Sequence, residues 1–310
     1  MENECERIIR KGIVDMSFFQ RTKYSEKRKI QLVMLDLIYE FDAFCKRHQL
    51  EYFLIFGSLL GAVRHGGFIP WDDDIDVVMP RESFLKLEKY KNDFSYPYFL
   101  QLPMKDDGYY YAVARLRNSN TSALDYPFIY QNFNMGIFLD INVLDNYNIE
   151  NGEKVFQIVD DLIVNNSTCM KMGHHFLSER DSIRVKEYKG EGPEENYNKI
   201  LKLQQENNTD GDCKHVWVSS GTVYGFKRNI FSKEDFSSFI TKSFEGLELR
   251  IPSGYQNILT IMYGDYMKLP PKEQRDIGHK NIRFDVSKNY KEALRDVFPE
   301  GKEGKICWKM

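Results

Sequence analysis

The chain has 310 residues, of which 42% are hydrophobic and 14% aromatic, so it holds enough apolar material for a globular core and is not a disordered chain. Its 43 basic and 46 acidic residues give a formal charge of -3, without the basic excess that nucleic-acid-binding proteins usually carry, and we expect no nucleic-acid partner. The length predicts one large domain or two small, interlocked ones.

The cysteines and the N-terminal segment bear on the cellular compartment. The five cysteines are scattered and none forms a CxxC pair, which argues against a disulfide framework or a zinc knuckle and favours a reducing, cytoplasmic compartment. The N-terminus alternates charges, and no apolar run approaches the ~20 residues that a membrane-spanning helix needs. We therefore expect a cytoplasmic protein with at most peripheral contact to the inner face of the membrane.

The first half of the chain alternates helix and strand patterns. Apolar residues at spacings of three and four predict a helix over residues 25–50, with Ser25 as its cap. A short buried strand at 51–56 stops at Gly57 and Ser58, and a helical turn at 59–63 leads to an exposed loop. Beyond it we predict strands at 74–79, 97–103, 109–118 and 136–145, and a helix at 82–91.

The second half mixes helical segments with polar stretches. Helical periodicity covers residues 153–171, whereas 182–212 is so polar that it is a loop, an insertion or a mobile helical lid. We further predict strands at 216–223 and 247–252 and helices at 233–241 and 255–264. The predicted fold class is mixed α/β (α+β): a helical region at 1–50, a catalytic core with a small mixed sheet at 51–150, and a mostly helical part at 151–310.

Three aspartates form the pattern that carries chemistry. In a strand over 74–79, Asp74 and Asp76 project from the same face, because successive side chains alternate. Adjacent carboxylates repel unless a cation joins them, and oxygen ligands with a phosphate are the usual setting for Mg²⁺. Asp140, flanked by apolar residues in a second predicted strand, would complete a metal set. The alternative is that DDDID, at 72–76, is an acidic turn with solvated charges.

A phosphate-binding turn is predicted beside these acids. Gly57 and Ser58 follow a buried strand and open a helix, so they offer unhindered backbone N–H groups and a hydroxyl. A lone Gly-Ser pair is weak evidence. Followed by a loop and two strands with inward aspartates, it predicts a site for a phosphate and a divalent metal.

Three longer segments carry a further signal: FGSLLGAVRHGGFIPWDDDIDVVMPR at 56–81, GIFLDINVLD at 136–145 and FEGLELRIPSGYQNILTIMYGDYMKLPP at 244–271. These segments resemble the LicD family, which also includes fukutin-type proteins and belongs to the nucleotidyltransferase superfamily. The resemblance covers nearly the whole chain apart from the N-terminal stretch and the polar region at 182–212. It implies a nucleotidyltransferase-type sheet with flanking helices.

The resemblance also implies an activity. Proteins of this family transfer a phospho-alcohol, typically phosphocholine from CDP-choline, to a hydroxyl of a glycan or a lipid-linked polysaccharide, in lipopolysaccharide, capsule or teichoic-acid biosynthesis, with Mg²⁺ or Mn²⁺ as helper. By position, Gly57 and Ser58 match the phosphate-binding turn, Asp74 and Asp76 the metal pair, and Asp140 the third acid. These three aspartates are the predicted catalytic and metal-binding residues, while Asp72 and Asp73 match the family's acidic run without an assigned role.

Four further residues are candidates for binding substrate. Arg64 and His65 lie between the phosphate turn and the acids, where they would bind phosphate oxygens or form a salt bridge within the loop. Trp71 would stack on a base or a quaternary ammonium, or pack under the loop. Arg115 would meet donor phosphates, or lie on an ordinary solvated sheet face. Tyr255, Tyr263, Tyr266 and His279 are weaker candidates for an acceptor or nucleoside pocket.

Several alternatives stay open at the level of sequence. The same acids would serve a nucleotidyltransferase that moves NMP from an NTP to a small acceptor, or would persist in a non-catalytic nucleotide-binding scaffold. The transferred group is equally undetermined, since a CDP- or CMP-linked alcohol or phosphonate would suit a metal-diphosphate site. The acceptor and the oligomeric state are not determined by the sequence.

Overall fold

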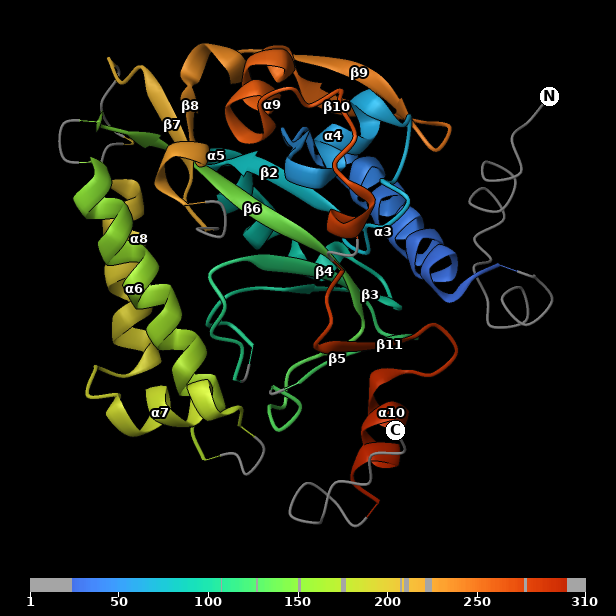
Figure 1. Cartoon of the computed structure of the whole chain (residues 1–310), viewed down its shortest axis with the longest axis vertical. Coiled ribbons are helices and arrows are strands. Elements are labelled where there is room, and N and C mark those ends of the chain that lie inside the picture. The colour runs from blue at the N-terminus through green and yellow to red at the C-terminus, as the bar shows by residue number, and fades with distance from the viewer. Residues whose placement is uncertain are drawn as a thin grey trace.

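A computed structural model describes residues 24–299, apart from 107, 127, 150–151, 174–176, 207, 209–211, 221–224 and 276–277. A mixed sheet runs through the middle of the molecule and helices pack around it (Figure 1). The predicted mixed α/β (α+β) class is confirmed. Among the described helices, none combines the length and apolar character that crossing a bilayer requires.

The central sheet has the strand order β1-β2-β6-β4-β3. Strand β7 also pairs with β6, and β8 pairs with β7. Its strands are β1 (Phe53–Leu54), β2 (Asp76–Pro80), β3 (Tyr98–Gln101), β4 (Ala114–Asn118), β6 (Ile137–Tyr147), β7 (His215–Val218) and β8 (Ile230–Ser232). Strands β2 and β6 pair in parallel, and the other pairs in this sheet are antiparallel. The strand β6 therefore runs through the middle of the sheet and touches most parts of the fold.

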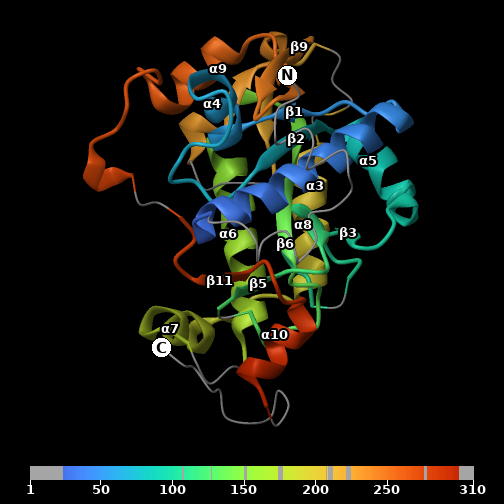
Figure 2. The ribbon, with the colours of Figure 1, turned by 90° about the vertical axis from the view of Figure 1, so that its right-hand side faces the viewer.

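Helix α3 (Glu26–His48) covers one face of this sheet (Figure 2). The Ser25 hydroxyl accepts a hydrogen bond from the Arg28 amide and so caps the helix as predicted. Its apolar stripe, which includes Leu37, Ile38 and Phe41, is fully buried. Burying each such side chain stabilises the fold by roughly 1.5–3 kcal/mol, so this stripe fixes the helix against β4 and β6.

The remaining elements surround the other parts of the sheet. They are the helices α4 (Phe56–Arg64), α5 (Arg81–Lys89), α9 (Tyr255–Tyr263) and α10 (Tyr290–Val297), the strands β5 (Ser122–Asp125), β9 (Phe239–Phe244), β10 (Leu247–Pro252) and β11 (Ile282–Asp285), and the 3-10 turns η1 (Lys91–Asp93), η3 (Phe226–Arg228), η4 (Lys233–Phe236) and η5 (Lys272–Gln274). Strands β9 and β10 form a hairpin near α4 and α9, while β11 pairs with β5 at the opposite end (Figure 1).

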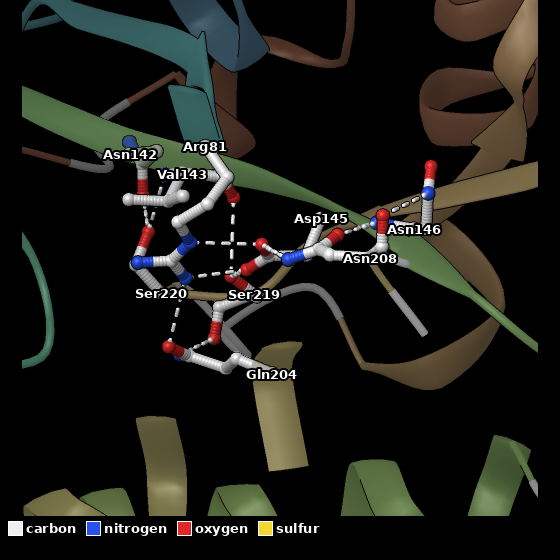
Figure 3. Close-up of polar contacts among 9 residues, drawn as sticks. All are labelled: Arg81, Asn142, Val143, Asp145, Asn146, Gln204, Asn208, Ser219 and Ser220. Carbon is white, nitrogen blue, oxygen red and sulfur yellow. Dashed lines mark hydrogen bonds and ion pairs between the residues drawn. The ribbon is translucent and has the colours of Figure 1, made fainter. Parts of the chain in front are cut away.

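A layer of three helices lies to one side of the sheet: α6 (Gly152–Lys171), α7 (Glu179–Glu187) and α8 (Pro193–Gln205). The polar stretch predicted at 182–212 thus contains a well-packed helix, because Ile200 and Gln204 of α8 are buried against α6 and the sheet. A buried ion pair fixes this layer (Figure 3). The Arg81 guanidinium binds both oxygens of Asp145 at 2.8 and 2.5 Å and also donates to Gln204 Oε1 at 3.1 Å.

Four predicted elements differ from the structure. The strand predicted at 216–223 ends at Val218, and its residues 221–223 lie outside the described part of the chain. The predicted strand at 74–79 begins at residue 76, so Asp74 lies in the preceding loop. The predicted helix at 233–241 is wrong: after η4 the chain enters β9, where it pairs with β10 along six residues. Only the second half of the predicted strand at 109–118 is a strand, because Tyr109 and Tyr111 instead pack with Phe133 in a separate aromatic cluster.

Candidate functional site

Asp76 and Asp140 lie side by side on the two parallel strands at the centre of the sheet. They are direct register partners in the β2–β6 pair, and the Asp140 amide donates to the Ile75 carbonyl at 2.9 Å. Because register partners project from the same face of a sheet, the two carboxylates face the same side. The sequence prediction that β6 supplies an acid next to the Asp74–Asp76 pair agrees with this geometry.

Asp72 and Asp74 approach these two residues from the loop before β2. The carboxyl groups of Asp72 and Asp74 are hydrogen-bonded to each other. Burial raises the pKa of Asp74 well above its usual value, and the charge of Asp72 raises it further. Burial likewise raises the pKa of Asp76, with added repulsion from Asp74 and Asp140. These buried acids therefore resist being ionised together unless a cation joins them.

The Gly57–Ser58 turn is attached directly to the acid loop. The Ser58 hydroxyl accepts a hydrogen bond from the Asp76 amide at 2.8 Å, and it can still donate its own proton. A Cβ atom at Gly57 would lie only 2.6 Å from Asp72 Oδ2, so any larger residue here would displace the Asp72 carboxylate. The N-terminus of α4, whose N-cap residue Ile55 makes no side-chain capping bond, thus lies next to the carboxylates.

Arg115 reaches the site from β4 and contacts the carboxylate of Asp140. Its Nε donates to Asp140 Oδ1 at 2.6 Å, and its guanidinium lies 3.9 Å from the Phe138 ring centroid and 4.8 Å from that of Tyr111. Burial by itself would lower the pKa of Arg115, but the Asp140 carboxylate outweighs it and the pKa is raised. One oxygen of Asp140 is therefore already engaged by a fixed positive charge.

His279 reaches the acid loop from the segment between α9 and β11, a placement that the sequence could not give. Both its backbone amide, at 3.0 Å, and its ring Nδ1, at 2.8 Å, contact the Asp73 carboxylate. This hydrogen bond raises the pKa of His279 to about 9. Burial alone would raise the pKa of Asp73, yet the bonds from His279 outweigh it and the pKa is lowered. An imidazolium ion is thus fixed at the edge of the acid cluster at neutral pH.

The other predicted substrate-binding residues lie around Trp71. Arg64 donates to the carbonyl oxygens of Tyr266 at 2.8 Å and Lys268 at 3.4 Å, so it anchors the segment after α9. His65 packs edge-on against Trp71, with ring centroids 6.0 Å apart. The Arg275 guanidinium lies 5.2 Å from the Trp71 ring centroid, where the sequence had suggested a base or a quaternary ammonium. In this structure these residues join the loop before the acids to the C-terminal part.

Asn142 links the acids to β7 and was not singled out from the sequence. Its Nδ2 donates to Asp76 Oδ1 at 3.3 Å, and its Oδ1 accepts from the Ser220 hydroxyl at 3.2 Å. Ser220 in turn accepts from the Val143 amide at 2.9 Å (Figure 3). Because Asn142 follows Asp140 by two residues on β6, strand alternation would have placed it on the acid face.

The carboxylate oxygens of this site are of the type that binds a hard divalent cation, although a complete set of metal ligands is not preformed. In the described part of the chain, no three histidine, cysteine or carboxylate side chains stand together with metal-ligand geometry. Asp74 and Asp76 nevertheless offer carboxylate oxygens whose pKa values are raised by burial and by repulsion from neighbouring carboxylates, and a bound cation would relieve that repulsion. Asp140 would contribute only one carboxylate oxygen, because Arg115 bonds to the other.

Comparison with known families identifies the region that contains these residues. Residues 49–142 match the model described as "LicD/FKTN/FKRP, nucleotidyltransferase domain". The chain carries a LicD-family domain. The match begins just before β1 and ends at Asn142, so the LicD-family domain includes Gly57, Ser58 and the five aspartates of the site, Asp72, Asp73, Asp74, Asp76 and Asp140.

Known proteins similar to this chain extend the likeness beyond the LicD-family domain. The lipopolysaccharide cholinephosphotransferase LicD of Haemophilus influenzae is 28% identical over 81% of this chain and 95% of its own length. An uncharacterised protein of Rickettsia prowazekii, RP689, is 30% identical over 43% of this chain and 47% of its own length. Mannosyltransferase regulator 4 of Saccharomyces cerevisiae is 27% identical, but over only 11% of its length.

Proposed function

We propose that this protein is a LicD-type transferase that moves a phosphocholine-like group from a CDP- or CMP-linked donor to a hydroxyl of a glycan or lipid-linked polysaccharide. The similarity to a lipopolysaccharide cholinephosphotransferase over most of both chains supports the transferase class. The observation that carries the proposal is the position of Asp74, Asp76 and Asp140 at the N-terminus of α4 within the matched domain.

In this proposal Asp74 and Asp76 hold Mg²⁺, which Mn²⁺ can replace. A bound Mg²⁺ would supply charge neutralisation at the diphosphate of the donor and on the departing nucleotide. The backbone amides of the Gly57–Ser58 turn and the Ser58 hydroxyl bind phosphate oxygens, because the N-terminus of a helix favours anions. His279, which Asp73 keeps protonated, adds positive charge next to the same phosphates.

We assign Asp140 to the acceptor hydroxyl. Arg115 bonds to one of its oxygens and holds the carboxylate in place, so the other oxygen can receive the hydroxyl proton as the acceptor attacks the phosphorus atom. Asp140 as a third metal ligand is the competing assignment that the sequence suggested. A measurement of metal affinity in an Asp140 variant separates the two.

The experiment that tests the proposal combines binding and turnover. Purified protein would be mixed with CDP-choline, CDP-ethanolamine, CDP-ribitol, a CMP-linked phosphonate or an NTP, each with and without Mg²⁺, and binding would be followed by thermal shift. Turnover would be followed in the same mixtures after addition of a glycan acceptor, by release of CMP or pyrophosphate. A specific donor raises the melting temperature by mass action. The matched variants are Asp76→Asn in the site and Asp161→Asn on the exposed side of α6.

We expect one CDP- or CMP-linked donor to stabilise the protein with Mg²⁺, and to release CMP, in the wild type and in Asp161→Asn but not in Asp76→Asn. Stabilisation by an NTP with release of pyrophosphate would replace the proposal with NMP transfer. Binding of a donor that is never turned over with any glycan acceptor would favour the non-catalytic scaffold.

A further inference from the structure

Two cavities lie away from the acid cluster, at opposite ends of the sheet. The larger, about 1350 Å³, lies where β2 and β6 end, and charged residues of both signs line it, among them Lys86, Lys214 and Glu234. The smaller, about 470 Å³, lies at the outer end of the β3–β4 pair, next to α10. Its volume is within the usual range for small-molecule sites, roughly 300–1,000 Å³.

The smaller cavity has an unusual combination of side chains. Aromatic rings and side-chain amides make up most of its lining: Tyr96, Phe99, Phe133 and Tyr290 are the aromatic residues, and Asn132, Asn134 and Asn289 are the amides. Asp106 and Lys291 contribute one charge of each sign, so the lining has no net formal charge. An anionic nucleotide or a phosphate would find no excess of positive charge here.

Tyr96 is the most exposed large apolar side chain in the described part of the chain, with 75% of its surface accessible. Its hydroxyl donates to Asn120 Oδ1, so the ring is tethered at its tip and does not fold down onto the core. Tyr290, the first residue of α10, is half-buried and lines the same cavity. The cavity therefore has aromatic surface open to solvent, close to amide groups.

We propose that this cavity is a binding site for a neutral saccharide unit. A sugar ring has an apolar face of C–H groups that packs on an aromatic ring, and its edge carries hydroxyls that both donate and accept hydrogen bonds. Tyrosine offers an apolar ring with a polar tip, and asparagine offers a donor and an acceptor on one group. Asn134 uses both atoms within the protein and Asn289 Oδ1 caps α10, so of these two amides the Asn289 Nδ2 group is the donor left for a sugar hydroxyl. The larger cavity has a single aromatic residue, Phe236, in its lining and does not offer this combination.

The position of the cavity relates it to the acid cluster, and this second step rests on the proposed function. Phe99 is the register partner of Arg117, and Arg117 is the register partner of Phe138. Phe138 and Asp140 are two residues apart on β6, so all four side chains share one face of the sheet. Arg117 and Phe138 are themselves buried between the cavity and Asp140, so a glycan with a distal unit in the cavity would bring its reacting hydroxyl to Asp140 over the side chains that cover these two residues.

Saccharide binding can be tested without any turnover. Saturation-transfer NMR would be run on the full chain with glucose, galactose, N-acetylglucosamine and lactose as probes, and Kd values would be obtained by titration. The variants are Tyr96→Ala and Tyr290→Ala. The matched control is Tyr39→Ala, which removes a partly exposed tyrosine of α3 that does not line the cavity.

We expect at least one probe to bind, and each cavity variant to weaken that binding about tenfold while Tyr39→Ala leaves it unchanged. Absence of binding by all probes, or equal binding by Tyr96→Ala and wild type, overturns the site. If Tyr290→Ala does not fold, Tyr96→Ala decides alone, because so exposed a ring contributes little to the core. The rise in melting temperature caused by the donor gives a separate readout, and it should be the same in both cavity variants as in wild type. If the donor does not stabilise the wild type, that result counts against the proposed function and not against the saccharide site.

Discussion

Asp76 and Asp140 are register partners on the two parallel strands at the centre of the sheet, and each is oriented by a different neighbour. Asn142 bonds to Asp76 at 3.3 Å, whereas Arg115 bonds to Asp140 at 2.6 Å. One carboxylate thus meets a neutral amide and the other a guanidinium. This difference leads to separate expectations for the two residues.

Replacing Asp76 with asparagine should abolish transfer and stabilise the metal-free protein. The amide removes a charge that burial and the neighbouring carboxylates disfavour, so we expect a gain of roughly 0.5–2 kcal/mol in the free energy of unfolding, as is common for active-site charges. Turnover should fall by at least about 10²-fold. Urea denaturation with and without Mg²⁺ measures the first effect. A destabilised but active variant would contradict both expectations.

Replacing Asp140 with asparagine separates proton transfer from metal binding. If Asp140 receives the hydroxyl proton, kcat should fall by roughly 10²–10⁴-fold while the Mg²⁺ affinity, measured by calorimetry, stays within about a factor of three of wild type. A loss of Mg²⁺ affinity comparable to that of Asp76→Asn would instead make Asp140 a metal ligand. Arg115→Lys keeps the charge but loses the planar fork, and should give a smaller loss of kcat.

Asp36 should make stability depend on pH. Burial raises its pKa to about 6, the hydrogen bond from Tyr98 lowers it, and the charge of Glu40 raises it. The folded protein therefore holds a proton that the unfolded chain releases near pH 4, and stability falls as the pH rises from about 4 through 6. Asp36→Asn should match wild type near pH 4 and exceed it by roughly 2–3 kcal/mol above pH 7. A difference that is constant with pH, or one reproduced by Asp161→Asn, would rule this explanation out.

Replacing only one partner of the Arg81–Asp145 ion pair should strongly destabilise the folded protein. Both side chains are buried, and Asp145 also accepts from Ser219 at 2.5 Å and from Asn208 at 2.6 Å. Asp145→Ala should lower the free energy of unfolding by roughly 3–5 kcal/mol, because it leaves a buried guanidinium unpaired. The double variant Arg81→Met with Asp145→Leu should recover part of that loss. Additive losses in the double variant would show that the pair itself matters little.

The sequence was sufficient for the centre of the fold and for the neighbourhood of the acids. Periodicity located α3 and α6, and the inward aspartate of β6 was placed beside Asp74 and Asp76. Local patterns carry this information because burial on one face of an element repeats at a fixed spacing. The short strands β5 and β11 escaped notice, since each has four residues and finds its partner far along the chain.

Contacts between distant segments could not be predicted. The bond of His279 to Asp73 spans 206 residues, and the bond of Arg64 to the Tyr266 carbonyl spans 202. The sequence around His279 or Arg64 contains no local pattern that indicates a partner so far along the chain. The contact of Arg275 with the Trp71 ring is a similar case, because an aromatic ring near acids can bind either the cation of a ligand or a cationic side chain of the protein itself.

The pairing of β11 with β5 has a consequence for how this protein can be divided. The matched region ends at residue 142, yet the largest core cluster also contains Leu37 from α3, Val218 from β7 and Leu249 from β10, all outside that region. The chain returns at its end to cover β5 and delivers His279 to the acid loop on the way. Residues 49–142 are therefore a unit of sequence similarity but not a portable module: a fragment cut at those limits would lose much of its core and one side of its reaction centre.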